Sequence, residues 1–477
     1  MKKLHIILVL AAICITATNC KKFLDINKDP NNPSSVSEGL ILSPVEVSIS
    51  TNVVGGYNGN TLSYWMQYLS LNQPSPGIET YRILPSDVDN SWTYYLYPNI
   101  LNNLNNMIQQ AQTAGHTEYV AIGKTLMAYN LAIITDAWGD VPYSQALQIA
   151  SVVKPAYDPQ EAVYGSIQNL LDSAIYYADQ PASAVAPGTD DYIYSGDMSK
   201  WKKFAYMLKA RYYLRLSNAP GRTASNQADS ALTALQNGFA SNDDNALVTY
   251  SGQPGSENPW YESTLPGAGG VVLSSSFVDT LVARKDPRLP VLASKGKHGN
   301  YAGRVIGSDP APDPDSFSVV NTSYGGYLPL DDENSAGAAA PVYLATYSEQ
   351  LFIEAEATFI KSGAVTATPI FKSAIGAHMD MLGIGETAKN AYVQSRGALT
   401  TDHGTEQIIN EKYIADFLSL ETYNDWRRTG FPVLQLAQNP YINYIPRRWP
   451  YPTNAILTNP QPQQSAALSD NVWWASK

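Results

Sequence analysis

The spacing of apolar residues constrains the fold of this chain most strongly, because several segments repeat it every three or four positions. Tyr119, Ile122, Leu126, Tyr129 and Ile133 form one such stripe, which predicts an amphipathic helix. Similar stripes predict helices after residue 159 and over 201–216, 347–360 and 405–423, with weaker ones near 57–71, 92–112, 222–237 and 367–382. Alternating strand patterns are sparse, so the sequence predicts an all-α fold.

Long irregular segments separate these helices. They span 180–197, 238–275, 285–342 and 429–477 and are rich in Gly, Pro, Asn, Asp and Ser. They also contain tryptophans and many tyrosines, which favours packed and ordered loops over linkers. Helices that recur in pairs suggest a helical repeat, although no clean 34-residue sequence period supports it.

One helix start carries a local signal. In the run from Asp158 to Glu161, Asp158 can cap a helix and Pro159 suits its first turn. Glu161 can reach back to the cap, as in a capping box. We therefore predict that Asp158 caps the helix that follows.

The N-terminus indicates export. Two lysines at positions 2 and 3 precede an uncharged apolar run over 6–17. That run is too short to cross a bilayer, which takes about 20 residues. A charged start followed by a short apolar run is typical of a secretory signal peptide.

The two cysteines refine this prediction. Cys14 lies within the apolar run, and Cys20 follows it directly after small and polar residues. This arrangement resembles a bacterial lipoprotein signal in which Cys20 carries the lipid and tethers the protein to a membrane. We predict a signal peptide over 1–19, a lipid anchor and linker over 20–40, and one helical body over 41–477. An ordinary signal peptide with a spare thiol is the alternative.

Charge and composition narrow the ligand class. Lys and Arg total 31 against 42 Asp and Glu, and the formal net charge is −11. No basic run occurs, so nucleic acid is an unsuitable partner. The chain contains 32 tyrosines among its 477 residues. Its polar character comes from Asn, Gln, Ser, Thr and Tyr, which suits neutral polar ligands.

The search for catalytic and metal-binding motifs gives nothing specific. The five histidines are scattered, and the zinc, phosphate-loop, dinucleotide and nucleophile-elbow patterns are absent. Carboxylate pairs occur at 243–244 and 331–332, as they do in any acidic chain of this length. Glu349, Glu354 and Glu356 share one expected helix and are predicted to serve packing and polar networks. We expect no enzyme activity, no cofactor and no metal.

Motifs in a fixed order carry a family resemblance. They lie at 23–31 (FLDINKDPN), 135–143 (TDAWGDVPY), 154–159 (KPAYDP), 201–204 (WKKF), 286–288 (DPR), 347–357 (YSEQLFIEAEA), 424–430 (NDWRRTG) and 445–448 (IPRR). Each motif is weak alone, but the ordered set resembles the SusD/RagB family of nutrient-binding outer-membrane lipoproteins of Bacteroidetes. The resemblance runs from Cys20 to about Asn459 and is closest to the SusD-like branch.

The resemblance implies an all-α fold of tetratricopeptide-like helix pairs with a loop-rich second region. It implies a lipid-anchored, surface-exposed protein of the outer membrane, partnered with a SusC-like TonB-dependent transporter. In that partnership the SusD-like subunit is a lid and a ligand-capture surface, not an enzyme. Family ligands are mostly oligosaccharides, and some members bind peptides.

The family motifs themselves are expected to be structural. We predict packing roles for their tryptophans, and ion-pair or carbonyl-binding roles for their paired arginines. The residues concerned are Trp138, Trp201, Trp426, Arg427, Arg428, Arg447 and Arg448.

Ligand contacts are expected in the less stereotyped segments, where aromatic rings can stack on sugar C–H faces and polar groups can bind hydroxyls. The candidates are Tyr57, Asn58, Gln73, Tyr81, Arg82, Trp92, Trp260 and Tyr261. The first six lie roughly where family members place an aromatic and polar ligand surface. The alternative for Trp92 is that it anchors the start of a core helix.

Four functions remain open at this point. The first is capture of an oligosaccharide for a transporter, and the second is capture of a peptide by the same type of subunit. A surface glycoside hydrolase would require a close carboxylate pair in a cleft. A helical scaffold without a small ligand would lack an aromatic surface.

Overall fold

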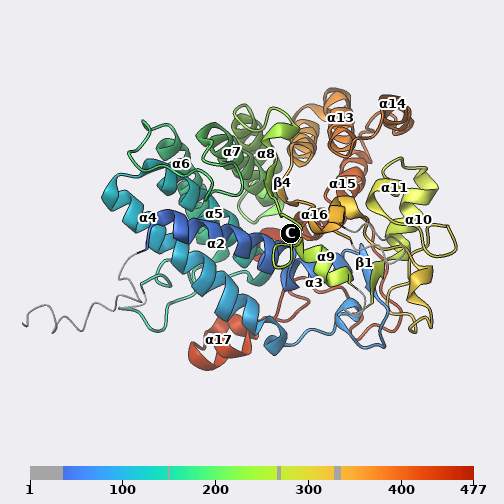
Figure 1. Cartoon of the computed structure of the whole chain (residues 1–477), viewed down its shortest axis with the longest axis horizontal. Helices are drawn as coiled ribbons and strands as arrows, with labels where there is room; N and C mark the ends of the chain where they lie inside the picture. Colours follow the sequence, from blue (N-terminus) through green and yellow to red (C-terminus); the bar gives the residue numbers. More distant parts are fainter. Residues whose placement is uncertain (1–35, 149–150, 266–269, 327–334, 477) are drawn as a thin grey trace, which may run out of the picture.

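The computed structural model describes residues 36–148, 151–265, 270–326 and 335–476 and confirms the helical fold (Figure 1). Helices dominate, and the strands form two small antiparallel sheets. The predicted signal peptide and Cys20 lie outside the described residues. None of the helices in the described ranges has both the length and the apolar character that a bilayer span requires.

One half of the molecule is a series of long helices that pack each against the next, from α4 to α8 and on to α13 and α15. In Figure 1 these helices follow one another across the upper part of the molecule. Their bounds are α2 (Glu38–Ser48), α4 (Asn103–Ala114), α5 (Thr117–Trp138), α6 (Gln160–Ala178), α7 (Met198–Arg215), α8 (Ala224–Leu235), α13 (Tyr347–Met381) and α15 (Gly404–Ala415). Packing between chain neighbours is the pattern of a helical repeat, which confirms the tetratricopeptide-like prediction.

The other half is rich in loops and short elements. Its helices are α3 (Tyr57–Trp65), α9 (Pro259–Thr264), α10 (Ser275–Arg284), α11 (Leu289–Leu292), α12 (Ser335–Ala338), α14 (Glu386–Ser395), α16 (Glu421–Thr429) and α17 (Thr453–Thr458). Two π-helical stretches, Ile49–Val54 and Ser91–Asn102, follow α2 and precede α4. Short 3-10 turns lie at Ile78–Thr80, Pro85–Val88, Leu216–Asn218, Asn242–Asp244, Pro314–Ser316, Thr322–Tyr324, Pro462–Ser465 and Trp473–Ala475.

The two sheets join segments that are distant in sequence. Strand β1 (Leu69–Leu71) pairs with β3 (Val271–Leu273), and Leu69 lies opposite Leu273. Strand β2 (Ala246–Val248) pairs with β4 (Val342–Ala345). The first sheet therefore holds an early segment against the 238–275 loop, and the second holds that same loop against the segment that precedes α13.

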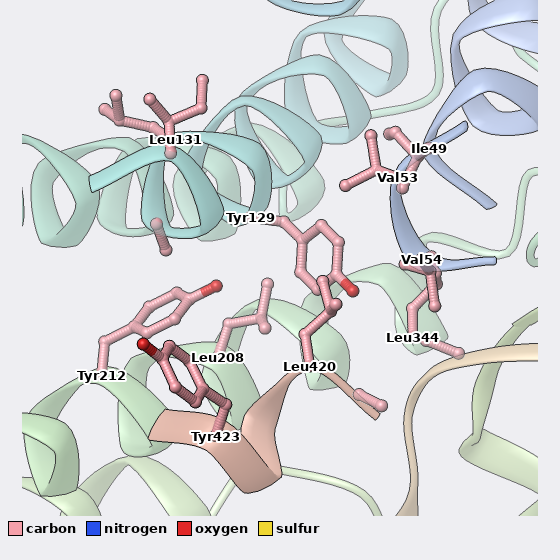
Figure 2. Packing of buried hydrophobic residues seen from close by; sticks show 14 of the residues in the cluster. Ile49, Val53, Val54, Tyr129, Leu131, Leu208, Tyr212, Leu344, Leu420 and Tyr423 are labelled. Atoms are coloured by element: carbon pink, nitrogen blue, oxygen red, sulfur yellow. The ribbon is translucent and has the colours of Figure 1, made fainter. Parts of the chain in front are cut away.

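Both halves contribute to one large hydrophobic core, and a smaller separate cluster lies among α13, α14 and α15. Helix α5 is buried on most of its surface, as its nearly continuous apolar sequence requires. Figure 2 shows residues of the cluster, among them Tyr129 and Leu131 of α5, and Leu208 and Tyr212 of α7. The cluster also includes Ile49, Val53, Val54, Leu344, Leu420 and Tyr423 from the loop-rich half. The aromatic loops are thus packed and ordered where the structure describes them.

The start of α6 corrects the predicted cap. Asp140 Oδ1, not Asp158, accepts the backbone N–H of Gln160 at 2.9 Å. Asp158 instead accepts the backbone N–H of Ser144 at 2.7 Å, and Glu161 forms a surface ion pair. An isolated antiparallel β-bridge between the backbones of Val141 and Asp158 brings Asp140 to the N-terminus of α6. This tertiary contact cannot be read from the local sequence.

Two predicted helices are shorter or divided. The helix expected over 405–423 is divided between α15 and α16, because Leu418 adopts the left-handed conformation with φ 65°. The helix expected over 57–71 ends at Trp65, and Gln67 adopts φ 62° before β1 begins. Such positive φ angles are costly outside glycine and end a helix.

In contrast, two other predicted helices are joined. The segments expected over 347–360 and 367–382 are both within α13, which is broken at Gly363 with φ 79° and ψ −179°. Only glycine reaches that backbone conformation without strain. The N-terminus of α13 is capped by Thr346, whose hydroxyl accepts the N–H of Glu349 at 3.0 Å.

A buried ion-pair network holds the family motifs together. Its members are Asp136, Arg211, Arg215, Glu349, Glu356, Lys412, Asp416, Glu421, Asp425 and Arg428. Arg211 pairs with Glu349 at 2.6 Å, and Lys412 pairs with Asp425 at 2.6 Å. Arg215 pairs with both Asp136 and Glu421.

The predicted structural roles are confirmed for the motif tryptophans and for Arg427, Arg428 and Arg448, whereas the Arg447 side chain contacts an aromatic ring in place of the expected carboxylate or carbonyl. Arg428 pairs with Glu356, and Arg427 donates to the Asp136 carbonyl at 2.7 Å. Arg448 donates to the Trp138 carbonyl. The tryptophans Trp138, Trp201 and Trp426 are buried, and the Arg447 guanidinium lies 4.4 Å from the Trp426 ring centroid. Glu354 is half-buried and forms no ion pair with any described residue.

The network predicts a pH effect at Asp416. Burial and the charge of Glu349 raise the pKa of Asp416 well above its ordinary value, and its Oδ2 atom has no hydrogen-bond partner in the described chain. The folded state therefore binds this proton more tightly than the unfolded state. The stabilisation is complete below the unfolded pKa of about 3.9 and is lost as pH rises through the folded pKa.

We expect Asp416→Asn, which cannot ionise, to gain stability relative to the natural protein between pH 4 and pH 8. The gain cannot exceed about 1.4 kcal/mol per pH unit, the limit for one proton. Urea unfolding of both proteins at the two pH values measures it. Asp243→Asn, at an exposed carboxylate, is the matched control and should show no such trend. A stability difference that is constant or falls toward pH 8 would contradict the assignment.

Candidate functional site

Three loops of the loop-rich half form one surface, which we call the three-loop face and define as residues 72–88, 305–311 and 433–445. Backbone hydrogen bonds connect these loops across large sequence distances. The Tyr441 N–H donates to the Thr80 carbonyl at 2.8 Å, and the Gln438 N–H donates to the Ile306 carbonyl at 2.8 Å. The third loop therefore lies directly against the first two.

A buried charge pair fixes the loops from below. Glu79 Oε1 accepts from Arg304 NH1 at 2.9 Å and from the Gly307 N–H at 3.0 Å. Glu79 Oε2 accepts from the Ser70 hydroxyl at 2.8 Å and the Leu71 N–H at 2.7 Å. Because both carboxylate oxygens are saturated inside the protein, this pair sets loop geometry and is not available to a ligand.

The three-loop face exposes aromatic and polar side chains. Tyr441 is 56% exposed and Tyr444 is 38% exposed. Gln73 and Arg82, both predicted ligand residues, are also exposed on these loops. Phenol rings beside an amide and a guanidinium offer stacking surface together with hydrogen-bond donors and acceptors.

Tyr57 lies at the start of the neighbouring helix α3 and is partly exposed. Its ring packs edge-on against Trp449, with centroids 5.9 Å apart and planes at 85°. Partial burial and the nearby Asp87 carboxylate raise the pKa of Tyr57 to about 12. Its hydroxyl therefore remains protonated at neutral pH and can donate a hydrogen bond.

Four of the other predicted ligand residues are buried in the free protein. Asn58 accepts the Ser91 hydroxyl at 2.8 Å, and the Tyr81 hydroxyl accepts the Ala437 N–H at 3.0 Å. Trp92 and Trp260 are 7% and 4% exposed. Their observed contacts are internal, and their contact with ligand remains a prediction.

The structure brings Trp260 close to the helix that carries Tyr57. A Cβ atom on Gly59 of α3 would lie 3.5 Å from Trp260 Cζ2, so α9 packs against α3. Asn258 caps α9 by accepting the Trp260 N–H at 2.7 Å. Tyr261 is half-buried on the same helix. This pair belongs to the wall beside α3, while Gln73 and Arg82 belong to the three-loop face.

Sequence reasoning did not single out Tyr441 and Tyr444. They lie in the run NPYINY just before the IPRR motif, within an irregular segment already noted for its tyrosines. That density of tyrosines was the only available signal. The placement of this segment against the 72–88 loop depends on the hydrogen bond between Tyr441 and Thr80, which joins the last quarter of the chain to the first.

Two cavities that the described residues form near α3 are too small for a sugar. One cavity of about 40 Å³ is lined by Trp260, Tyr324 and Asp416 among others, and another of about 20 Å³ is lined by Asn58 and Trp449 among others. Such volumes admit water molecules only. A nutrient-sized ligand at this end of the molecule would therefore lie on the surface.

The described residues contain no group of three or more His, Cys, Asp or Glu side chains that could hold a metal ion. The carboxylates at 331–332 lie outside the described residues. Of the other pair, Asp244 is buried and bound by Lys203 at 2.9 Å. A single paired carboxylate does not form the two-carboxylate site of a glycosidase.

Solved structures share this fold over nearly the whole chain. A chitin-binding protein has a TM-score of 0.78 and 24% identity, over 92% of this chain and 100% of its own. A SusD/RagB family protein from Bacteroides thetaiotaomicron has a TM-score of 0.78 and 25% identity, over 92% and 99%. A chitin-binding SusD homolog from Flavobacterium johnsoniae has a TM-score of 0.75 and 19% identity, over 92% and 98%.

Family-level similarity covers most of the sequence. No curated protein sequence matches the chain. A family model, SusD-like, described as starch-binding and associating with the outer membrane, matches residues 30–452. That range includes the helical repeat, the buried ion-pair network and the three-loop face. The chain therefore belongs to the SusD-like family of outer-membrane-associated nutrient-binding proteins.

Proposed function

We propose that this protein captures an oligosaccharide on the three-loop face. The observation that carries the proposal is the exposure of Tyr441, Tyr444, Arg82 and Gln73 on loops that buried contacts hold in place. Fixed aromatic rings bind at little conformational cost, because they lose few rotamers on binding. Membership of a family described as starch-binding, and relatives named as chitin-binding, support a glycan ligand.

Capture would serve uptake through the outer membrane. We infer that lipid on Cys20 tethers the protein there, and that the captured glycan passes to a SusC-like TonB-dependent transporter. The sequence between Cys20 and Glu38, where α2 begins, would connect the anchor to the body. The proposed role is binding and delivery without turnover, and the absence of catalytic motifs from the sequence is consistent with it.

The eight residues named from the sequence divide between two roles in this proposal. Tyr57, Gln73 and Arg82 would touch the ligand together with Tyr441 and Tyr444, because all five are exposed. The remaining residues would support this surface from within or beside it: Asn58, Tyr81, Trp92, Trp260 and Tyr261.

We expect Tyr441→Ala to weaken oligosaccharide binding about 5- to 30-fold, which corresponds to about 1–2 kcal/mol for loss of an aromatic contact. Isothermal titration with chitohexaose and with maltoheptaose measures the change. Tyr441→Phe keeps the ring and should retain most of the affinity.

The matched control is Tyr176→Ala on α6, a tyrosine of similar exposure at 61% on the helical half. It should bind as the natural protein does. Equal loss in both variants, or no loss in Tyr441→Ala, would show that the ligand lies elsewhere.

A further inference from the structure

A third cavity lies at the far end of the helical series from α4–α6, among α10, α13, α14 and α15. Its volume is about 310 Å³ and it is open to solvent, so it is large enough to admit one sugar ring. In Figure 1 these four helices lie together on the right of the molecule. The cavity shares no lining residue with the three-loop face.

Two arginines in the wall converge on one carboxylate oxygen. Arg284 NH1 donates to Glu411 Oε1 at 2.7 Å, and Arg396 NH1 lies 3.7 Å from the same atom. Arg288 NH2 occupies Glu411 Oε2 at 2.8 Å, and the Tyr392 hydroxyl donates to Oε1 at 3.1 Å. Arg284 and Tyr392 therefore use both lone pairs of Oε1, which leaves no hydrogen bond from this atom for Arg396.

These arginines retain unused donors. Arg396 Nε donates to Ser395 Oγ at 3.3 Å, and its other donors meet no acceptor among the residues that the structure describes. Arg284 likewise makes only its bond to Glu411 within the described chain. Both side chains are about a quarter exposed, at 24% and 22%. A ligand that enters the cavity would therefore meet guanidinium N–H groups that can donate hydrogen bonds to it.

Three arginines and three carboxylates lie at or beside the cavity, so its wall is close to neutral and the two wall arginines differ in how fully their donors are used. Arg288 is buried and neutralised by Asp286, with Nε and NH2 bonds of 2.9 and 2.6 Å. Glu411 can then offset one of the two wall arginines. Glu406 also lines the cavity, and its carboxylate lies 3.1 Å from His403 Nδ1, which offsets its charge only when that imidazole is protonated. Arg396 has only the 3.7 Å ion pair with Glu411 and a contact with the Tyr392 ring, whose centroid lies 4.7 Å from its guanidinium carbon. Its spare N–H donors are the groups that an anion would bind.

The rest of the wall suits a sugar. Asn410 is half-buried and its amide has no partner in the described chain, so it offers both a donor and an acceptor to hydroxyl groups. Phe371 adds an apolar ring. In contrast, the Gln407 amide is already used, since it accepts from the Thr400 N–H at 2.9 Å.

We propose that this cavity binds an acidic sugar residue, with its carboxylate on Arg396 and Arg284 and its hydroxyls on Asn410. The site would be additional to the three-loop face and does not depend on it. It would let the protein prefer glycans that carry uronic acid over neutral ones.

Titration of the full-length protein with glucuronate, glucose and acetate tests the proposal. We expect saturable binding of glucuronate, weaker binding as salt is raised because salt screens the ion pair, and at least tenfold weaker binding of glucose and of acetate. Equal binding of glucose would overturn the role of charge. Equal binding of acetate would overturn the assignment of a sugar.

Variants locate the binding. Arg396→Gln removes the charge at a partly exposed position and should weaken glucuronate binding at least tenfold, and Asn410→Ala should weaken it severalfold. Arg222→Gln, which disrupts a surface ion pair with Glu161, is the matched control and should leave it unchanged. Unchanged glucuronate binding in folded Arg396→Gln would overturn the proposal. Tyr441→Ala should not affect this site, so its outcome separates the two proposals.

Discussion

Arg215→Met is expected to destabilise the protein by about 3–5 kcal/mol, the usual cost of leaving buried charges without their partner. Arg215 is 3% exposed and pairs with both Asp136 and Glu421. Methionine fills much of the same volume but leaves two carboxylates facing each other inside the core. Urea unfolding followed by circular dichroism measures the loss.

Surface ion pairs provide the contrast for this prediction. Arg222→Met breaks a pair with Glu161 in which both side chains are largely exposed, and it should cost less than about 1 kcal/mol. Adding Glu421→Gln to Arg215→Met should recover part of the stability, because one orphaned charge is then removed. A loss below 1 kcal/mol in Arg215→Met would mean that the network does not hold the motifs together.

Trp92→Ala is expected to cost about 3–5 kcal/mol, as for other large-to-small changes in a core. The Trp92 ring packs against Trp138 with centroids 5.1 Å apart, and against Tyr97 at 4.8 Å. Tyr157 and Tyr451 complete its surroundings. Thermal and urea unfolding should both show the loss.

Because Trp92→Ala is expected to destabilise the protein, this variant alone cannot show whether Trp92 contacts the ligand. A loss of binding in Trp92→Ala would be ambiguous if the protein were also destabilised, so Trp92→Phe is needed to keep an aromatic ring in place. If Trp92→Ala left stability unchanged and abolished oligosaccharide binding, Trp92 would be a direct ligand contact rather than the core residue described above.

The helices could be predicted where their stripes face the shared core. The stripe from Tyr119 to Ile133 lies within α5, and the motif around Glu349 and Glu356 lies within α13. Helix ends were less predictable, because they depend on contacts from elsewhere in the chain. Asp140 replaces Asp158 as the partner of the α6 N-terminus only because a bridge from Val141 places it there.

The candidate site was harder to predict for a related reason. Tyr81 and Tyr441 look alike in sequence, yet Tyr81 is buried while Tyr441 is exposed. The difference arises from a bond between the Tyr81 hydroxyl and the Ala437 N–H, across more than three hundred residues. No local pattern reports such a contact. The charged motif residues were predictable, because their regular order along the chain matched the SusD-like pattern.

The central claim is glycan capture, and isothermal titration of the full-length protein against chitohexaose, maltoheptaose and neutral peptides of similar length tests it most directly. We expect saturable heat of binding with at least one of the two oligosaccharides. This heat should be lost or strongly reduced in Tyr441→Ala and retained in Tyr176→Ala. Saturable heat with peptides alone would contradict glycan capture and favour a peptide-capturing subunit. Silence with both oligosaccharides in a folded protein would contradict it as well.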